Sequence, residues 1–253
     1  MRNIRKLTRR LPVTFALTGA LALSLAACGD SGSSDVSGDP VAEMQAPDGQ
    51  SWQDIVKKTD EGGFVIGNPA APIKLVEYAS VTCSHCAQFE EEAFPELFEE
   101  YVSTGKVSLE IRNFLLNPYD IPITLLTQCS GEDAFLALTK EVFKNQGDIL
   151  GKLQTADQAV MQAAIDKPED ERFLALAQAM GILDFFAARG VSQDQAKACL
   201  TDKAKADALI AQTEKGKNEV GVSGTPFFLI NGQKTEFSGW PALESDLQEA
   251  GAR

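Results

Sequence analysis

Residues 73–86, IKLVEYASVTCSHC, decide the fold of this chain. The first eight of them are mostly apolar, which is typical of a buried β-strand. The last four, Cys83-Ser84-His85-Cys86, form a C-x-x-C pair whose two thiols can close a small ring with each other. The chain therefore places two neighbouring thiols directly after a strand.

The residues that follow the pair predict a helix. Apolar side chains recur along it at positions i, i+3, i+4 and i+7, namely Phe94, Leu97, Phe98 and Tyr101. The acidic residues around them are expected to form a solvated face: Glu90, Glu91, Glu92, Glu96, Glu99 and Glu100. Pro95 lies inside this helix and should kink it, because proline has no backbone N–H group.

The start of a helix is a favourable place for a reactive thiol. Free backbone N–H groups and the positive end of the helix dipole both stabilise the thiolate, which is the nucleophilic form. We therefore expect Cys83 to be the exposed attacking sulfur and Cys86, one turn later, to be the shielded resolving sulfur. His85 between them can add positive charge and lower the pKa of Cys83 further. A purely stabilising disulfide is the alternative, but so short a loop yields little entropy gain.

The order of the expected elements along the whole chain is β-β-α-β, then a long helical stretch, then β-β-α. Asn231-Gly232 is a strong signal for a two-residue hairpin. A C-x-x-C pair at a strand-to-helix junction in this order predicts a thioredoxin-like α/β fold with a helical insertion. We expect the thioredoxin-like domain to comprise residues 51–119 and 219–253, and the insertion to comprise residues 120–218. The expected strands are 62–67, 73–80, 107–116, 227–230 and 234–237, and the expected terminal helix is 241–250.

Gly224-Thr225-Pro226 precedes the strand that follows the insertion. In the thioredoxin fold a cis-proline at the start of a strand lies beside the C-x-x-C pair, so Pro226 is expected to be cis. The backbone of Thr225 could then pair with an extended substrate segment, as in strand addition. Thr225 and Pro226 are therefore the expected substrate-binding residues.

Together these motifs resemble the DsbA-like family of exported thiol–disulfide oxidoreductases, over about residues 62–253. In that family a buried glutamate six residues before the first cysteine helps to move protons at the resolving cysteine, and Glu77 stands at that spacing. A buried carboxylate has a raised pKa and could take the proton of Cys86. Ser84 departs from the proline of the best-known members. Thr225 also occurs in isomerase-type relatives, which leaves the direction of electron flow open.

The other cysteines are Cys28, Cys129 and Cys199. If Cys28 is an anchor, an even number remains, and an even number in an exported protein points to disulfides. We therefore predict a structural disulfide between Cys129 and Cys199, which also resembles the second disulfide of some family branches. Two buried free thiols are the alternative.

The first 27 residues read as an export signal. Their first ten positions include five basic residues, and an uncharged apolar stretch follows. Leu25-Ala26-Ala27-Cys28 resembles a bacterial lipobox, so residues 1–27 are expected to be a lipoprotein signal peptide and Cys28 the lipidated residue. An uncleaved anchor or a plain secretory signal are the alternatives. Residues 28–50 are expected to be a flexible tether.

Composition excludes several classes of protein. The 253 residues carry 23 basic and 36 acidic side chains, which gives a formal net charge of −13. No run of basic residues occurs beyond the first ten, so we expect no nucleic-acid binding. His85 is the single histidine, which excludes His-rich metal sites. Loss of residues 1–27 would leave 18 basic against the same 36 acidic residues. We expect no cofactor.

The expected activity is disulfide exchange with thiols of exported proteins through a mixed disulfide at Cys83. The expected direction is disulfide donation, with reoxidation by a quinone-coupled membrane partner; a reductase or isomerase fed by a reductant donor is the alternative. A metal-binding lipoprotein, with Cys83, His85 and Cys86 holding a soft ion, is a different class. The expected location is the periplasmic side of a bacterial membrane, lipid-anchored or alternatively soluble, and the expected state is a monomer.

Overall fold

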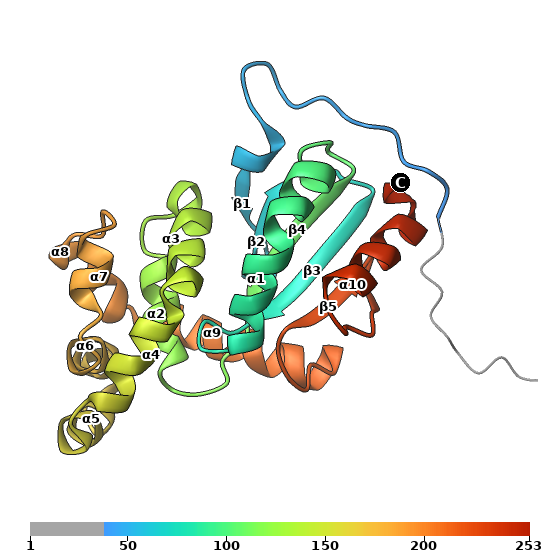
Figure 1. Ribbon diagram of the computed structural model, residues 1–253. Helices are drawn as coiled ribbons and strands as arrows, with labels where there is room; N and C mark the ends of the chain where they lie inside the picture. Colours follow the sequence, from blue (N-terminus) through green and yellow to red (C-terminus); the bar gives the residue numbers. More distant parts are fainter. Residues whose placement is uncertain (1–37) are drawn as a thin grey trace, which may run out of the picture. The chain divides into compact units, whose positions relative to one another are not determined.

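The computed structural model describes residues 38–253 (Figure 1). The expected signal peptide, Cys28 and the first part of the expected tether lie outside the described residues.

A mixed sheet forms the centre of the fold, with strand order β1-β2-β4-β3-β5-β6. β3 runs parallel to β4 and antiparallel to β5, and the other neighbouring strands are antiparallel. Every residue of β3 except Lys74 is buried, which explains its nearly continuous apolar sequence. The strands are β1 (Val56–Lys58), β2 (Phe64–Gly67), β3 (Ile73–Ala79), β4 (Val107–Asn113), β5 (Phe227–Ile230) and β6 (Gln233–Lys234).

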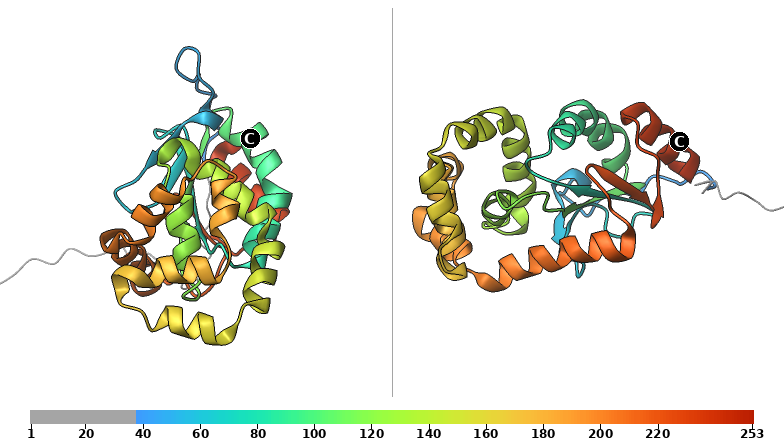
Figure 2. Two further views of the ribbon diagram at one scale, coloured as in Figure 1. Left: turned by 90° about the vertical axis from the view of Figure 1, so that its left-hand side faces the viewer. Right: turned by 90° about the horizontal axis from the view of Figure 1, so that it is seen from below.

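Helices cover both faces of this sheet (Figure 2). α1 (Ser84–Glu96) and α10 (Trp240–Leu247) pack on one face, where they share a hydrophobic core with Leu75 and Ala79 of β3. α9 (Lys203–Lys215) and the π-helical segment η3 (Gly216–Val220) run beneath the other face. A Cβ atom at Gly216 would lie only 3.0 Å from the Tyr78 ring, so glycine permits this close approach.

The stretch between β4 and β5 is helical, as expected, and most of it builds a second hydrophobic core. This core contains Ile123, Leu176 and Phe186, and it also includes Val81 from the loop that precedes Cys83. Besides α9, the insertion contains α2 (Asp120–Thr127), α3 (Glu132–Lys144), α4 (Gln146–Thr155), α5 (Gln158–Ile165), α6 (Glu169–Ala179), α7 (Leu183–Ala187) and α8 (Gln193–Leu200).

Several element boundaries differ from expectation. Strand β1 was not predicted, because it has three residues and two of them are exposed lysines, so it shows no alternation. The strand expected at 107–116 ends at Asn113, and the one expected at 234–237 is the two-residue β6. α1 continues after Pro95 as the π-helical segment η2 (Leu97–Val102), consistent with the missing N–H group of proline. A 3-10 turn, η1 (Trp52–Asp54), precedes β1, and η4 (Gln248–Ala252) follows α10.

Residues 38–50 contain no helix or strand, but they are attached to the fold. The N–H of Gly38 donates to the carbonyl oxygen of Glu249 at 2.8 Å, and that of Val41 donates to Gly251 at 2.9 Å. This part of the expected tether is therefore held along the C-terminal segment rather than free.

Within residues 38–253, no helix combines the length and the apolar character that crossing a membrane requires.

Candidate active site

The two cysteines of the C-x-x-C pair lie where the sequence predicts them. β3 ends at Ala79, residues 80–82 form a short loop, and Cys83 is the N-cap residue of α1. Cys83, expected to be the exposed sulfur, is buried at 8% exposure because Thr225 packs against it, and Cys86, inside the first turn, is fully buried. Both are free thiols in this structure, which therefore represents the reduced state.

The Cys83 sulfur is surrounded by hydrogen-bond donors. A hydrogen bond from the Cys86 thiol makes the largest contribution to lowering the pKa of Cys83, to about 5. The Thr225 side chain and the backbone N–H groups of Cys86 and His85 act in the same direction, while burial acts against them. Cys83 is therefore a thiolate at neutral pH, as nucleophilic thiol chemistry requires.

Cys86 has the opposite character. The hydrogen bond that it shares with Cys83, its burial and the nearby charge of Glu77 all raise the pKa of the Cys86 thiol far above its ordinary value. Cys86 therefore stays protonated while Cys83 is ionised. The pair consists of one nucleophile and one proton-carrying partner.

Glu77 lies beneath the pair. Along β3 it shares a sheet face with Leu75 and Ala79, and this face is covered by α1. Its side chain is 2% exposed, and burial, followed by the negative charges of Cys83 and Glu90, raises the pKa of Glu77 to about 8. Glu77 can therefore hold a proton at neutral pH close to Cys86.

Glu90 departs from the solvated face expected for the acidic residues of α1. The other five residues of that set are exposed, whereas Glu90 is half-buried. Burial is the main cause that raises the pKa of Glu90, and Lys140 and Lys144 of α3 act against it. No local pattern predicts this burial, because the partner helix α3 lies fifty residues further along the chain.

Thr225 and Pro226 approach the pair from the start of β5. The peptide bond between them is cis. The Cys83 thiol donates a hydrogen bond to the carbonyl oxygen of Thr225 at 3.2 Å. The Thr225 hydroxyl is buried and has no hydrogen-bond partner among the described residues while Cys83 is a thiol, which leaves it able to donate to the thiolate.

A groove of about 370 Å³, lined in part by Thr225 and Pro226, brings together residues from both halves of the thioredoxin-like domain. Its rim includes His85, which is exposed. Its apolar lining comes from Phe89, Pro226, Phe237 and Trp240, and Gln88 and Glu92 contribute polar groups. Phe237 and Trp240 are not predicted as site residues from the sequence, because their role depends on where the C-terminal segment folds back.

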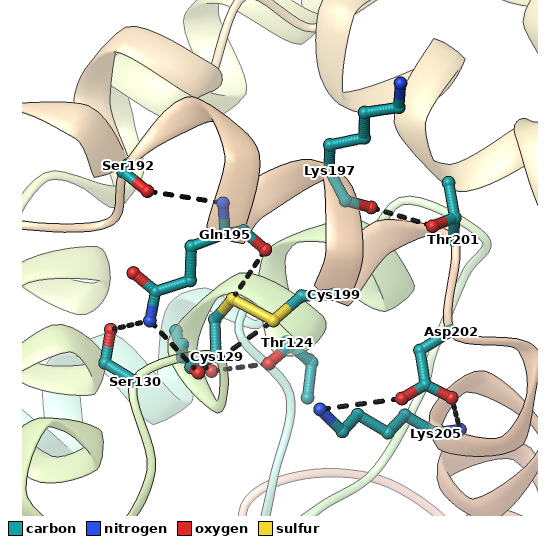
Figure 3. Close-up of a disulfide and its surroundings, with 11 residues drawn as sticks. Thr124, Cys129, Ser130, Ser192, Gln195, Lys197, Cys199, Thr201, Asp202 and Lys205 are labelled. Atoms are coloured by element: carbon teal, nitrogen blue, oxygen red, sulfur yellow. Dashed lines mark hydrogen bonds and ion pairs between the residues drawn. A yellow bond between two sulfur atoms is a disulfide. The ribbon is translucent and has the colours of Figure 1, made fainter.

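Cys129 and Cys199 lie apart from this site, within the insertion (Figure 3). Cys129 follows α2 and Cys199 belongs to α8, and their sulfur atoms are bonded at 2.02 Å. The side-chain amide of Gln195 donates to the carbonyl oxygen of Cys129 at 3.4 Å and to Ser130 Oγ at 3.2 Å. The bond therefore joins the turn after α2 to α8.

The structure thus brings together Cys83, Cys86, His85, Thr225 and Pro226, with Glu77 buried below them. Cys28 lies outside the described residues. Among residues 38–253, no three His, Cys, Asp or Glu side chains are grouped so as to hold a metal ion. Cys129 and Cys199 are bonded to each other in the insertion, so neither sulfur is a free thiolate ligand for an ion held at the C-x-x-C pair.

Comparison with known proteins identifies the family. The family model for thioredoxin matches residues 59–249, so the chain belongs to the thioredoxin family. The crystal structure of a protein-disulfide isomerase from Novosphingobium aromaticivorans is 34% identical, with a TM-score of 0.69, over 73% of this chain and 94% of that one. The structure of Wolbachia pipientis alpha-DsbA1, 22% identical, has a TM-score of 0.59 over 74% of this chain and 89% of that one, which shows a shared fold.

A curated relative extends the comparison. A Rickettsia bellii protein, named by inference as a protein-disulfide oxidoreductase, is 29% identical over 192 residues, or 76% of this chain. The matched region spans 65% of that relative's own length. The predicted thioredoxin-like fold with a helical insertion, and the resemblance to DsbA-like proteins, are confirmed.

Proposed function

We propose that this protein is a thiol–disulfide oxidoreductase that exchanges the Cys83–Cys86 disulfide with cysteines of exported proteins. The observation that carries the proposal is the opposite ionisation of the two thiols. The pKa of Cys83 is lowered to about 5, whereas that of Cys86 is raised. A thiolate beside a protonated thiol is the arrangement that thiol–disulfide exchange requires.

The proposed reaction begins with the oxidised pair. A substrate thiolate attacks Cys83 Sγ, the Cys83–Cys86 bond breaks, and a mixed disulfide forms at Cys83. Cys86 leaves with the electron pair and takes a proton, for which buried Glu77 is the source. A second substrate thiolate then attacks the substrate sulfur of the mixed disulfide and releases the Cys83 thiolate. Two electrons have moved to the protein, and the substrate carries a new disulfide.

The low pKa of Cys83 favours disulfide donation as the direction. Stabilisation of the Cys83 thiolate stabilises the reduced protein, which makes the disulfide a stronger oxidant. A thiolate with a low pKa is also a good leaving group in the last step. Thr225 and Pro226 would align the substrate backbone by strand addition, and the apolar side chains of the groove would hold its neighbouring residues.

The cellular setting belongs to the same proposal. The N-terminal sequence supports export and lipidation at Cys28, which would hold the protein on the periplasmic side of a membrane. A quinone-coupled membrane partner would reoxidise the pair after each cycle. A reductase or isomerase would use the same residues but would need a reductant donor instead.

The test uses the purified protein and a peptide with two cysteines. The oxidised protein is expected to form the peptide disulfide stoichiometrically. Cys86→Ser is tested with the disulfide-linked dimer of a one-cysteine peptide: the Cys83 thiolate attacks that disulfide and one peptide thiolate leaves. The resulting mixed disulfide at Cys83 is expected to persist, since no resolving thiol remains. Cys83→Ser is the matched control and should do neither; full activity in Cys83→Ser would refute the proposal. Equilibration in glutathione buffers gives the redox potential. A potential near that of the reducing cytosol would favour the reductase or isomerase alternative.

A further inference from the structure

The loop of residues 80–82, which joins β3 to Cys83, is attached to the helical insertion. Val81 is buried in the hydrophobic core of the insertion, whereas Cys83 and Cys86 belong to the core between the sheet and its helices. The chain therefore passes from one core to the other within two residues of the reactive sulfur. Any shift of the insertion relative to α1 would be transmitted to this loop.

Gln146 holds the end of the loop. It is the first residue of α4 and is 6% exposed. Its Nε2 donates to the carbonyl oxygen of Val81 at 3.0 Å and to that of Cys83 at 2.9 Å. Because both partners are acceptors, only the NH₂ end of the side chain can face them. The Cys83 carbonyl also accepts from the N–H of Ala87 at 3.2 Å, so Gln146 fixes the peptide group from which α1 starts.

Asp120 holds the beginning of the loop. It is the first residue of α2 and is fully buried. One carboxylate oxygen accepts from Ser80 Oγ at 2.8 Å and from the N–H of Thr82 at 3.1 Å. The other accepts from the N–H groups of Leu116 at 2.8 Å and Asn117 at 3.1 Å. The carboxylate therefore ties the loop to the segment that leads into the insertion.

We infer that the helical insertion controls the reactivity of Cys83 by holding residues 80–83 through Asp120 and Gln146, with Gln146 as a positioning residue. The physical reason is that a hydrogen bond to the Cys83 thiolate depends on the direction of the donor N–H group. The N–H groups of His85 and Cys86 stabilise the Cys83 thiolate only if the first turn of α1 aims them at the sulfur. Gln146 fixes the orientation of that turn at the Cys83 carbonyl. The inference rests on the proposed thiol chemistry and assigns part of its control to residues outside the thioredoxin-like domain.

A purely structural role for Gln146 makes a different prediction. In that case its amide only satisfies two buried carbonyl groups, and its loss lowers stability without changing the sulfur. The decisive measurement is therefore the pKa of Cys83, obtained from the pH dependence of thiolate absorbance or of the alkylation rate in the reduced protein. The free energy of unfolding is measured alongside it.

The principal variant is Gln146→Met, which keeps an unbranched side chain of similar length but has no donor. The matched control is Gln128→Met. Gln128 is also in the insertion, but its Nε2 donates to Asn113 Oδ1 of β4 at 2.9 Å and not to the loop. We expect Gln146→Met to raise the pKa of Cys83 by about one. That is the effect of losing one backbone N–H hydrogen bond to the Cys83 thiolate when the first turn of α1 is no longer held in place. Gln128→Met is expected to leave that pKa unchanged.

Gln146→Asn is the second variant and serves if Gln146→Met does not fold. Its shorter amide can reach at most one of the two carbonyl groups, so an intermediate shift is expected. Unchanged Cys83 titration in the folded Gln146 variants, with lowered stability alone, would overturn the inference. If Cys83 of the unmodified protein titrates like an ordinary thiol, the proposed function itself fails, so the two failures are distinguishable.

Discussion

The ionisation of Cys83 should appear as a pH-dependent gain in the stability of the reduced protein. The pKa of Cys83 is about 5 in the folded chain, against 9.0 for an ordinary cysteine. A lowered pKa contributes stability that is fully present above the unfolded value and is lost as pH falls through the folded value. Between pH 5 and pH 7 the unfolded thiol is protonated while the folded one is charged, and this two-unit difference amounts to about 3 kcal/mol.

The experiment compares the free energy of unfolding in urea of Cys83→Ser with that of the protein that keeps Cys83. Both are measured in the reduced state at intervals from about pH 4 to pH 7. Both are made in a Glu77→Gln background, because Glu77 also titrates within reach of this range and its pKa depends on the charge of Cys83. The protein with Cys83 should gain about 3 kcal/mol relative to Cys83→Ser as pH rises across this range.

Cys86→Ser is the control for this experiment. Its hydroxyl can still donate to the Cys83 sulfur, and Cys86 itself stays protonated throughout the range because its pKa is raised. In the same Glu77→Gln background, the free energy of unfolding of Cys86→Ser should therefore depend on pH in the same way as that of the parent protein, which keeps both cysteines. A constant difference between the parent and Cys83→Ser from pH 4 to pH 7 would refute the reasoning, since the Cys83 thiol would then have an ordinary pKa.

Two further predictions concern the insertion and the buried carboxylate. Replacing both Cys129 and Cys199 with alanine removes a disulfide between residues that are 70 apart in the sequence. The free energy of unfolding in urea should fall by about 2–5 kcal/mol, while the pKa of Cys83 stays unchanged. An unchanged urea midpoint would contradict this prediction. Glu77→Gln should stabilise the protein by up to about 3 kcal/mol at pH 7 and not at pH 4, because the raised pKa imposes a penalty that grows as pH rises from the unfolded value of 4.5 towards about 8. Equal effects of Glu77→Gln at the two pH values would show that its charge is not the cause.

The parts of the fold that the sequence predicts well have local signals. The C-x-x-C pair at residues 83–86 follows an apolar strand and precedes a helical pattern, and Thr225-Pro226 precedes the strand 227–230. Each of these patterns depends on neighbouring residues alone, so their order along the chain is enough to predict the architecture. Strand β1 is the counterexample: it is an edge strand, and only its pairing with β2 defines it.

The parts of the site that the sequence does not reveal depend on distant packing. Gln146 has no local pattern, because its partners Val81 and Cys83 lie more than sixty residues away. Asp120 resembles an ordinary acidic residue in the first turn of a helix. Its burial and its contacts with the loop before Cys83 arise only when the insertion packs against the thioredoxin-like domain.

The placement of His85 gives this protein a built-in spectroscopic probe. It is the single histidine of the chain, it stands between the two cysteines in the sequence, it is exposed, and it lines the same groove as Pro226. Imidazole ring signals in a proton NMR spectrum therefore arise from one residue and need no isotope label. Oxidation of the pair, formation of a mixed disulfide and occupation of the groove would each change the surroundings of that ring. The redox cycle could then be followed in the unmodified protein, because each state would give its own set of His85 ring signals.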